Sequence, residues 1–408
     1  MQSFLKPRVI CAVDIGSRSI KGVVVQCSQF HHQILATSVM PAYGIKDGQV
    51  SNLSDLSDTI QTLTKDLKKL SGKTFHDMSL GVGHQLVRLK STNAVISLIE
   101  RGVKHITRRD VKHVLNQASL LGMKIGEEIL HRIPQNYLVD DSLVVSPIGL
   151  TGKKMGVRAL LVIAQASKML NVVKAVSQAG FETQHIHFTP FAAAECHLSD
   201  EQKNKGVAYL DMGAKFTTLL MYKDGSLQHI EKYPFGGDDI THNMCQDLNI
   251  PFELAETIKL SYSDANDLRA TDEEILIKKD EGYKPIKREE VIAAIEPKVQ
   301  NIVTMVVNHL KQTKHFEELN AGVIMSGSAS LLSGLIERIN TKVNMPIELV
   351  RVSQNGEQGL ANPPLFAGAL GVACYREKNA LEDANKHKHQ PWTKQVVERI
   401  SDLYHEYF

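Results

Sequence analysis

The sequence lacks the features that mark several classes of protein. Its 408 residues include five cysteines, none in Cys-x-x-Cys spacing, and its formal net charge is only +2. Scattered cysteines argue for a reducing compartment and against a structural metal, and near-neutrality argues against a nucleic-acid partner. No stretch approaches the roughly 18 uncharged apolar residues that span a bilayer, and no apolar signal-peptide core follows Met1. We therefore expect a cytoplasmic body without a membrane-spanning segment.

One pattern occurs in both halves of the chain: an apolar strand ending in an aspartate, a turn of small residues and a second strand. The first copy contains Asp14 and Gly16, and the second contains Asp211 and Gly213. A glycine-containing turn lets backbone N–H groups converge on phosphate oxygens, and an aspartate at a strand end can hold a cation, directly or through water. The duplication predicts two similar lobes around one magnesium nucleotide.

A third strand, Gly322–Met325, also runs into a small-residue turn, and we expect a helix to follow at Leu331–Asn340. Such a turn suits a nucleoside or a phosphate. Either aspartate turn alone would more often be an ordinary hairpin corner. The three corners in this order, however, resemble the phosphate-1, phosphate-2 and adenosine segments of the actin, sugar-kinase and heat-shock-chaperone ATPase superfamily. The resemblance implies an α/β actin-like ATPase fold of duplicated ribonuclease-H-like lobes.

Two segments interrupt the repeated plan and predict two inserted subdomains. The first holds several strands and a helix capped by Thr107 with Asp110 behind it, and the second holds a helix at Glu253–Tyr262, a polar stretch to Tyr283 and a long helix at Arg288–Lys311. The expected boundaries are 1–83 and 165–205 for the first lobe, 84–164 for its insertion, 206–240 and 315–377 for the second lobe, 241–314 for its insertion, 378–391 for a polar linker and 392–408 for a terminal helix.

The terminal helix is expected to be amphipathic. Its apolar face would hold Trp392, Val396, Ile400, Leu403, Tyr404 and Tyr407, with Phe408 at the end. The pattern fits a helix docked on its own domain and equally a peripheral membrane anchor. Acidic side chains outnumber basic ones within the helix, which weakens any attraction to an anionic membrane surface.

Four further stretches make the resemblance more specific: Ile133–Tyr137, Pro147–Gly152, Ala255–Lys259 and Val291–Lys298. Over nearly its full length the chain resembles the FtsA family of actin-like bacterial division proteins. That resemblance implies that the first insertion is the small subdomain characteristic of FtsA, that the second receives the C-terminal peptide of FtsZ, and that the last helix targets the membrane. It also implies ATP-dependent self-association, other division proteins as partners, and a peripheral location on the cytoplasmic face of the bacterial inner membrane at the division site.

The resemblance assigns residues to the expected site. The first phosphate loop would use Asp14, Gly16, Ser17, Arg18, Ser19 and Lys21, and the second would use Asp211, Gly213, Ala214 and Lys215. Gly236, Gly237 and Asp238, with Glu256 and Lys259, would surround ribose and base, and Gly327, Ser328 and Ala329 would lie on the adenosine side. Asp14 and Asp211 would hold Mg²⁺, directly or through water. For the acidic FtsZ peptide we expect Arg288, Lys298 and Asn301, although a solvated helix face explains these three equally well.

The second loop departs from the superfamily's usual Asp-x-Gly-Gly-Gly-Thr-x-Asp. Ala214 and Lys215 replace two glycines, and Thr218 stands where the last aspartate would be. Because a lost carboxylate removes a magnesium or water contact, we expect slow ATP hydrolysis or none, with nucleotide acting mainly as a conformational ligand.

Two alternative functions stay open. A sugar or acid kinase of this fold would need a catalytic carboxylate facing a substrate cleft, for which Asp238-Asp239 is the candidate. A scaffold of another membrane assembly, similar to PilM, would be expected to lack the helix at Trp392–Phe408.

Overall fold

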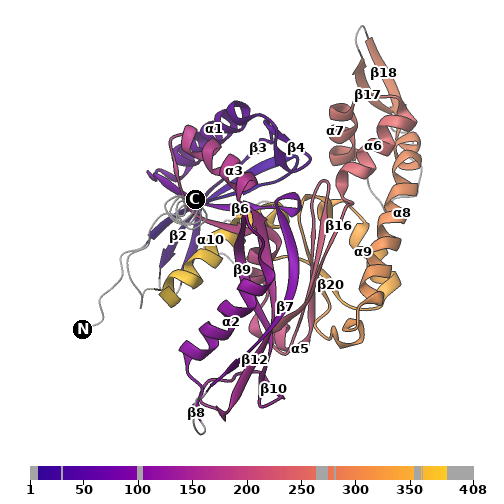
Figure 1. The fold of residues 1–408 in the computed structure, drawn as a ribbon. Coiled ribbons are helices and arrows are strands. Elements are labelled where there is room, and N and C mark those ends of the chain that lie inside the picture. Colours follow the sequence, from indigo (N-terminus) through magenta and orange to yellow (C-terminus); the bar gives the residue numbers. More distant parts are fainter. Residues whose placement is uncertain are drawn as a thin grey trace.

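Two five-stranded sheets with the same topology form the centre of the molecule (Figure 1). The computed structural model describes residues 8–28, 31–98, 104–262, 274–279, 282–352, 360 and 362–383. In each sheet three successive antiparallel strands are followed, on the other side of the first strand, by two parallel ones. The sheets are β1 (Arg8–Ile15), β2 (Ser19–Ser28), β3 (His31–Pro41), β6 (Asp77–Val82) and β13 (Glu182–Phe188), and β14 (Val207–Met212), β15 (Thr217–Lys223), β16 (Ser226–Tyr233), β19 (Val323–Ser326) and β20 (Ile347–Leu349). This duplication confirms the fold predicted from the two aspartate turns.

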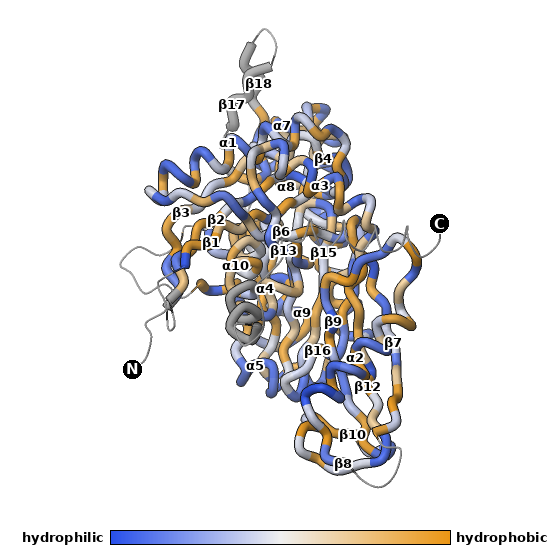
Figure 2. The backbone as a smooth tube through the Cα atoms, turned by 60° about the vertical axis from the view of Figure 1, so that its left-hand side comes forward, coloured by the Kyte–Doolittle hydropathy of each residue, from blue (hydrophilic) through white to orange (hydrophobic). Residues whose placement is uncertain are grey.

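Helices cover both faces of the first sheet, which explains why its central strand is apolar at successive positions. Cys11 and Val13 belong to the core under α1 (Leu53–Ser71) and α3 (Ala166–Gln178), whereas Ile10 and Ala12 belong to the core under α4 (Thr189–His197) and α10 (Pro363–Asp383). Along α1 the tube of Figure 2 alternates between hydrophilic and hydrophobic, as expected of a helix with one buried face. The helix begins after Asn52, whose side chain accepts from two backbone amides, and ends at Gly72 in the left-handed region.

The first insertion lies at one end of the molecule, at the bottom of Figure 1. It consists of a four-stranded sheet in the order β10-β9-β12-β7 with α2 packed against it, and a capping box of Thr107 and Asp110 starts that helix. Its elements are the short helix η1 (His84–Leu86), then β7 (Val87–Ser97), β8 (Lys104–His105), α2 (Arg108–Gly122), β9 (Glu127–Val139), β10 (Ser142–Val144), β11 (Thr151–Gly152) and β12 (Lys154–Gln165).

The second insertion lies at the upper right of Figure 1 and is mainly helical. It contains α6 (Gly237–Leu248), α7 (Phe252–Tyr262) and α8 (Arg288–Gln312), and a hairpin of β17 (Glu274–Lys279) and β18 (Gly282–Lys287) lies between α7 and α8 in the sequence. The hairpin begins within the polar stretch that precedes Tyr283 in the sequence. Backbone pairing between its two strands stabilises the hairpin, because each strand satisfies the other's N–H and C=O groups.

One expectation for the C-terminal region, the helix at Leu331–Asn340, was wrong in part. Residues Ser328–Leu331 form a short 3-10 turn, and the helix α9 (Leu335–Val343) begins only after Gly334, whose φ of +72° interrupts the helical path. The helix α10 continues to Asp383, so the first residues of the expected linker at 378–391 are helical. The terminal helix predicted at 392–408 lies outside the described residues.

The remaining elements are short: β4 (Ile45–Lys46), β5 (Gln49–Val50), α5 (Asp200–Lys205) and η2 (Phe316–Glu318). Among the helices that the structure describes, none is long and apolar enough to cross a membrane.

Candidate functional site

A pocket of about 780 Å³, open to solvent, lies where the two sheets approach each other. The β1–β2 and β14–β15 turns line it from the two lobes, and the end of β19, the start of α10 and the segment after β6 complete it. Of the residues predicted from the sequence, those lining the pocket are Asp14, Gly16, Ser17, Arg18, Ser19, Lys21, Asp211, Gly213, Ala214, Lys215, Gly327 and Ser328.

The first turn holds Asp14 in a fixed position. Its Oδ1 accepts a hydrogen bond of 2.8 Å from the Thr189 hydroxyl, and its Oδ2 lies 3.7 Å from Lys21 Nζ. The turn closes through Gly16 N–H, which donates to the carbonyl of Ser19. A Cβ on Gly16 would lie 2.7 Å from that carbonyl oxygen, so this tight turn requires glycine.

The second turn holds Asp211 in a corresponding position. Its Oδ1 accepts from the Ser326 hydroxyl at 3.0 Å, and Gly213 N–H donates to the carbonyl of Phe216. Burial, and then the charge of Asp14, raise the pKa of Asp211 to about 6. A cation between the two carboxylates would be held by both, and oxygen donors of this kind suit Mg²⁺.

The third corner is shaped by Gly327, whose φ is +88°. A Cβ there would lie 2.2 Å from the carbonyl oxygen of Met212, so this close approach to the second turn excludes other residues. Gly327 and Ser328 line the pocket, whereas Ala329 lies beside α6, near Gly237.

His84 is a pocket residue that we did not predict from the sequence. Its Nε2 lies 2.5 Å from the hydroxyl of Thr218, the residue that replaces the usual aspartate, and its ring stacks on Phe216 with centroids 4.9 Å apart. Lys232 donates to the carbonyl oxygens of His84 and Val87, fixing this segment against the second lobe. Burial and the nearby Lys232 charge lower the pKa of His84 to about 3, so the imidazole is neutral at physiological pH. The sequence did contain a signal that could have marked His84 as a site residue: it follows Gly83 at the end of β6, the strand next to β1.

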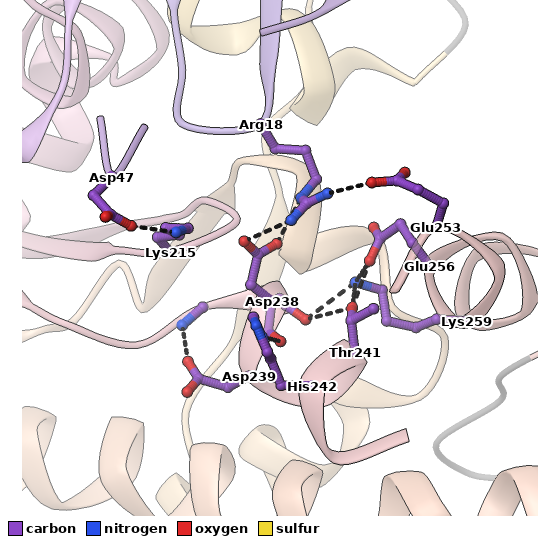
Figure 3. A network of polar contacts seen from close by, with 12 residues as sticks. Arg18, Asp47, Lys215, Asp238, Asp239, Thr241, His242, Glu253, Glu256 and Lys259 are labelled. Carbon is purple, nitrogen blue, oxygen red and sulfur yellow. Dashed lines mark hydrogen bonds and ion pairs between the residues drawn. The ribbon is translucent and has the colours of Figure 1, made fainter. Parts of the chain in front are cut away.

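The residues expected around ribose and base do not line the pocket. Gly237 N–H and Asp238 N–H donate to the carbonyl oxygens of Gly213 and Ala214, which joins the start of α6 to the second turn. Lys259 Nζ lies 2.7 Å from Glu256 Oε2 and also donates to Thr241 and to the Gly237 carbonyl (Figure 3). Gly236 lies directly before α6. Lys259 and Glu256 thus contact each other and the start of α6, and Asp238 reaches the pocket only through Arg18.

Ion pairs cross between the lobes at the pocket (Figure 3). Arg18 donates two hydrogen bonds to Asp238, at 2.8 and 3.0 Å, and Lys215 Nζ lies 2.5 Å from Asp47 Oδ1. Both cations belong to the predicted phosphate loops, and each is paired with a carboxylate from the opposite lobe.

The three residues predicted to bind a peptide are spread along α8. Lys298 lies 3.6 Å from Asp239 and so faces α6, Asn301 is exposed, and Arg288 is half-buried in the first turn. Their role stays a prediction.

The donor set fits a magnesium polyphosphate. Glycine turns, two lysines and an arginine supply N–H groups and positive charge, while Asp14 and Asp211 supply hard oxygen donors. In the part of the chain that the structure describes, no cluster of three or more histidines, cysteines or carboxylates could hold a metal. A Mg²⁺ ion here would therefore need oxygens from the nucleotide or from water to complete its shell.

The two sheets share one topology, and three turns line the pocket between them. This arrangement defines a protein of the actin-like ATPase fold. Among solved structures, the PilM–PilN type IV pilus biogenesis complex matches with a TM-score of 0.64 at 17% identity, covering 90% of this chain and 97% of that chain. MreB5 of Spiroplasma citri bound to AMPPNP matches with a TM-score of 0.51 at 11% identity, covering 93% and 98%. These likenesses establish the fold.

Sequence comparisons then identify the family. The family model of "Cell division protein FtsA" matches residues 208–371, and that of the "SHS2 domain inserted in FTSA" matches residues 85–163, together more than half of the chain. FtsA of Pseudomonas aeruginosa is 23% identical over 381 residues, covering 92% of this chain and 91% of that protein, and FtsA of Neisseria meningitidis serogroup B is 24% identical, covering 93% of each. The chain belongs to the FtsA family of cell division proteins.

Proposed function

We propose that this protein is an ATP-binding, actin-like scaffold of bacterial cell division. It self-associates and tethers FtsZ filaments to the cytoplasmic face of the inner membrane through its C-terminal amphipathic helix. The observation that carries the nucleotide part is the pair of aspartate turns that line one pocket from two lobes. Membership of a cell-division family supports the cellular role.

The pocket suggests how this chain would hold a nucleotide. Backbone N–H groups of the two turns, with Lys21 and Lys215, would bind the phosphates, and Asp14 and Asp211 would hold Mg²⁺ directly or through water. Bound Mg-ATP supplies a charged group that both lobes contact at once. Because each lobe provides part of the site, binding favours the arrangement in which the lobes are close. That MreB5, a protein of the same fold, is bound to AMPPNP supports this assignment.

We predict that ATP turnover is slow. Thr218 contributes a hydroxyl bonded to His84 where a carboxylate could otherwise orient water or a metal, and neutral His84 cannot replace that charge. Phosphate release by the purified protein should stay well below about 1 per second. Lys21→Ala should abolish the part of this release that the protein itself catalyses. Turnover in the range of kinases, about 1–100 per second, would contradict the prediction.

The tether is tested with anionic vesicles, FtsZ filaments and ATP. We expect the full chain to sediment with vesicles and to carry FtsZ with it, more strongly with ATP because polymers present many anchors at once. A chain ending at Gln390 should stay in the supernatant, and Leu403→Glu in the full chain should act in the same way by removing apolar contact with the membrane.

A second variant separates the FtsZ contact from the membrane contact. Lys298→Glu should reduce FtsZ recruitment while leaving the protein's own sedimentation intact, because the change lies on α8 and not in the tail. Lys311→Glu, on an exposed part of the same helix, is the matched control. Equal sedimentation of the full and shortened chains would mean that the tail docks on the body and does not anchor the protein to the membrane. Phosphoryl transfer to a small molecule would instead indicate a kinase.

A further inference from the structure

Arg18 makes the most extensively supported contact between the two lobes at the pocket. Its Nε and Nη2 donate to the two oxygens of Asp238, at 2.8 and 3.0 Å. This two-point arrangement is the strong form of an arginine–carboxylate pair. The side chain of Asp238 is only 5% exposed, so the pair is shielded from solvent on its carboxylate side.

The guanidinium is held from further directions in the second insertion. It lies over the ring of Phe252, 4.0 Å from the centroid, and 3.9 Å from Glu253. The Phe252 ring makes a T-shaped contact with His242, whose Nδ1 lies 2.7 Å from the carbonyl oxygen of Asp238. On the other side the Arg18 carbonyl accepts from Ala42 N–H, which ties the first turn to its own lobe. Both ends of the contact are therefore anchored.

We propose that Arg18 and Asp238 form a latch between the lobes that limits how fast a nucleotide enters and leaves the pocket. The proposal rests on the nucleotide site proposed above. Arg18 lines the pocket, so the lobes cannot separate at that wall while the pair is intact. The pair of Lys215 with Asp47 across the pocket has a carboxylate that is 61% exposed, against 5% for Asp238, and such exposed pairs contribute little. The latch is therefore the Arg18 contact.

As a latch, Arg18 and Asp238 would bind each other and would not contact the nucleotide directly. The two roles, latch and nucleotide ligand, predict opposite effects of Asp238→Asn on the rate of nucleotide release. If Arg18 is a phosphate ligand, removing the charge of Asp238 frees it for the phosphates, and release slows. If the pair is a latch, Asp238→Asn and Arg18→Gln break the same contact, so both speed exchange in the same direction.

Stopped-flow association and dissociation of a fluorescent ATP analogue with Mg²⁺ test the latch on the full chain. We expect Asp238→Asn and Arg18→Gln each to raise both rate constants by about tenfold or more, the size of a charge-assisted contact, with no further gain in the double variant. Arg18→Lys, which keeps the charge but not the two-point geometry, should fall between. Arg338→Gln, which breaks the pair with Glu296 away from the pocket lining, is the matched control and should leave both rates unchanged. Slower release from Asp238→Asn, or unchanged association in both variants, would overturn the proposal.

Hydrogen exchange on nucleotide-free protein separates failure of the latch from failure of the nucleotide site. Breaking the latch should speed exchange of the amides of Gly237 and Asp238, which bond to the second turn, relative to wild type and to Arg338→Gln. If wild type binds no analogue, the nucleotide proposal fails while exchange still tests the latch. Unchanged exchange in Asp238→Asn and Arg18→Gln would overturn the latch whether or not nucleotide binds.

Discussion

Two side chains, Thr218 and His84, change the charge of the pocket relative to the usual loop of the superfamily. The second turn lacks a final carboxylate, and the hydroxyl in its place bonds to an imidazole from the other lobe. A neutral imidazole and a hydroxyl can orient water but cannot neutralise a cation as a carboxylate does. The negative charge at the centre of the pocket therefore comes from Asp14 and Asp211. Under the proposed function, this balance would favour binding of a magnesium nucleotide over its rapid hydrolysis.

The buried state of His84 predicts a measurable loss of stability in acid. Its pKa is about 3 when folded, against about 6.5 in an unfolded chain. Below pH 6.5 the unfolded chain therefore binds a proton that the folded protein excludes, and the free energy of unfolding falls by up to about 1.4 kcal/mol per pH unit. His84→Gln should remove this contribution, so its urea-unfolding free energy should fall less steeply than wild type between pH 6 and pH 5. His113→Gln, on the exposed face of α2, is the control, and equal slopes for wild type and His84→Gln would contradict the prediction.

At the scale of elements, the start of α6 depends on its close approach to the second turn. Gly236 lies at the helix start, where its N–H donates to Asp239 at 2.8 Å and the next two amides donate to carbonyls of the turn. A Cβ on Gly236 would lie 2.4 and 2.5 Å from the carbonyl oxygens of Gly213 and Ala214. The glycine thus sets the distance between helix and turn, and with it the position of Asp238.

Gly236→Ala should therefore destabilise the protein. Either the turn or the helix must shift, which by comparison with overpacked cores costs about 1–3 kcal/mol. Gly83→Ala is the matched control, because that glycine has φ of −95° and a Cβ added there would meet no atom within 4 Å. We expect the urea midpoint of Gly236→Ala to fall well below that of Gly83→Ala. Equal midpoints would mean that the backbone relaxes without cost.

The sequence predicted best those elements that are determined by residues close to one another in the chain. The strands around Asp14 and Asp211 follow from apolar runs and glycine turns, and the capped start of α2 follows from Thr107 and Asp110. The contact between Arg18 and Asp238 could not be read from spacing, because the partners are 220 positions apart. Both residues were assigned to the site, yet their mutual pairing depends on how the two lobes meet.

At the scale of the whole molecule, the first insertion is partly continuous with the main core. The ends of the insertion are neighbours in one sheet, where Val87 pairs with Ala164. Leu160 and Ile133 belong to the main core cluster, whereas Met155 belongs to a separate cluster farther along the same strands. Gln135 also donates to backbone carbonyls of β16 in the second lobe. The insertion is thus anchored at its inner half and has its own small core at its outer half.

This division predicts two levels of stability within one strand, β12. Leu160→Ala should lower the free energy of the main unfolding transition by about 2–5 kcal/mol, because it leaves a cavity in the shared core. Met155→Ala removes a similarly buried side chain from the outer core, so it should speed hydrogen exchange in α2 and the adjoining strand ends while leaving the main transition nearly unchanged. Urea unfolding combined with native-state hydrogen exchange measures both effects. If Met155→Ala shifts the main transition as much as Leu160→Ala does, the insertion and the first lobe unfold as one cooperative unit, and the outer core has no independent opening.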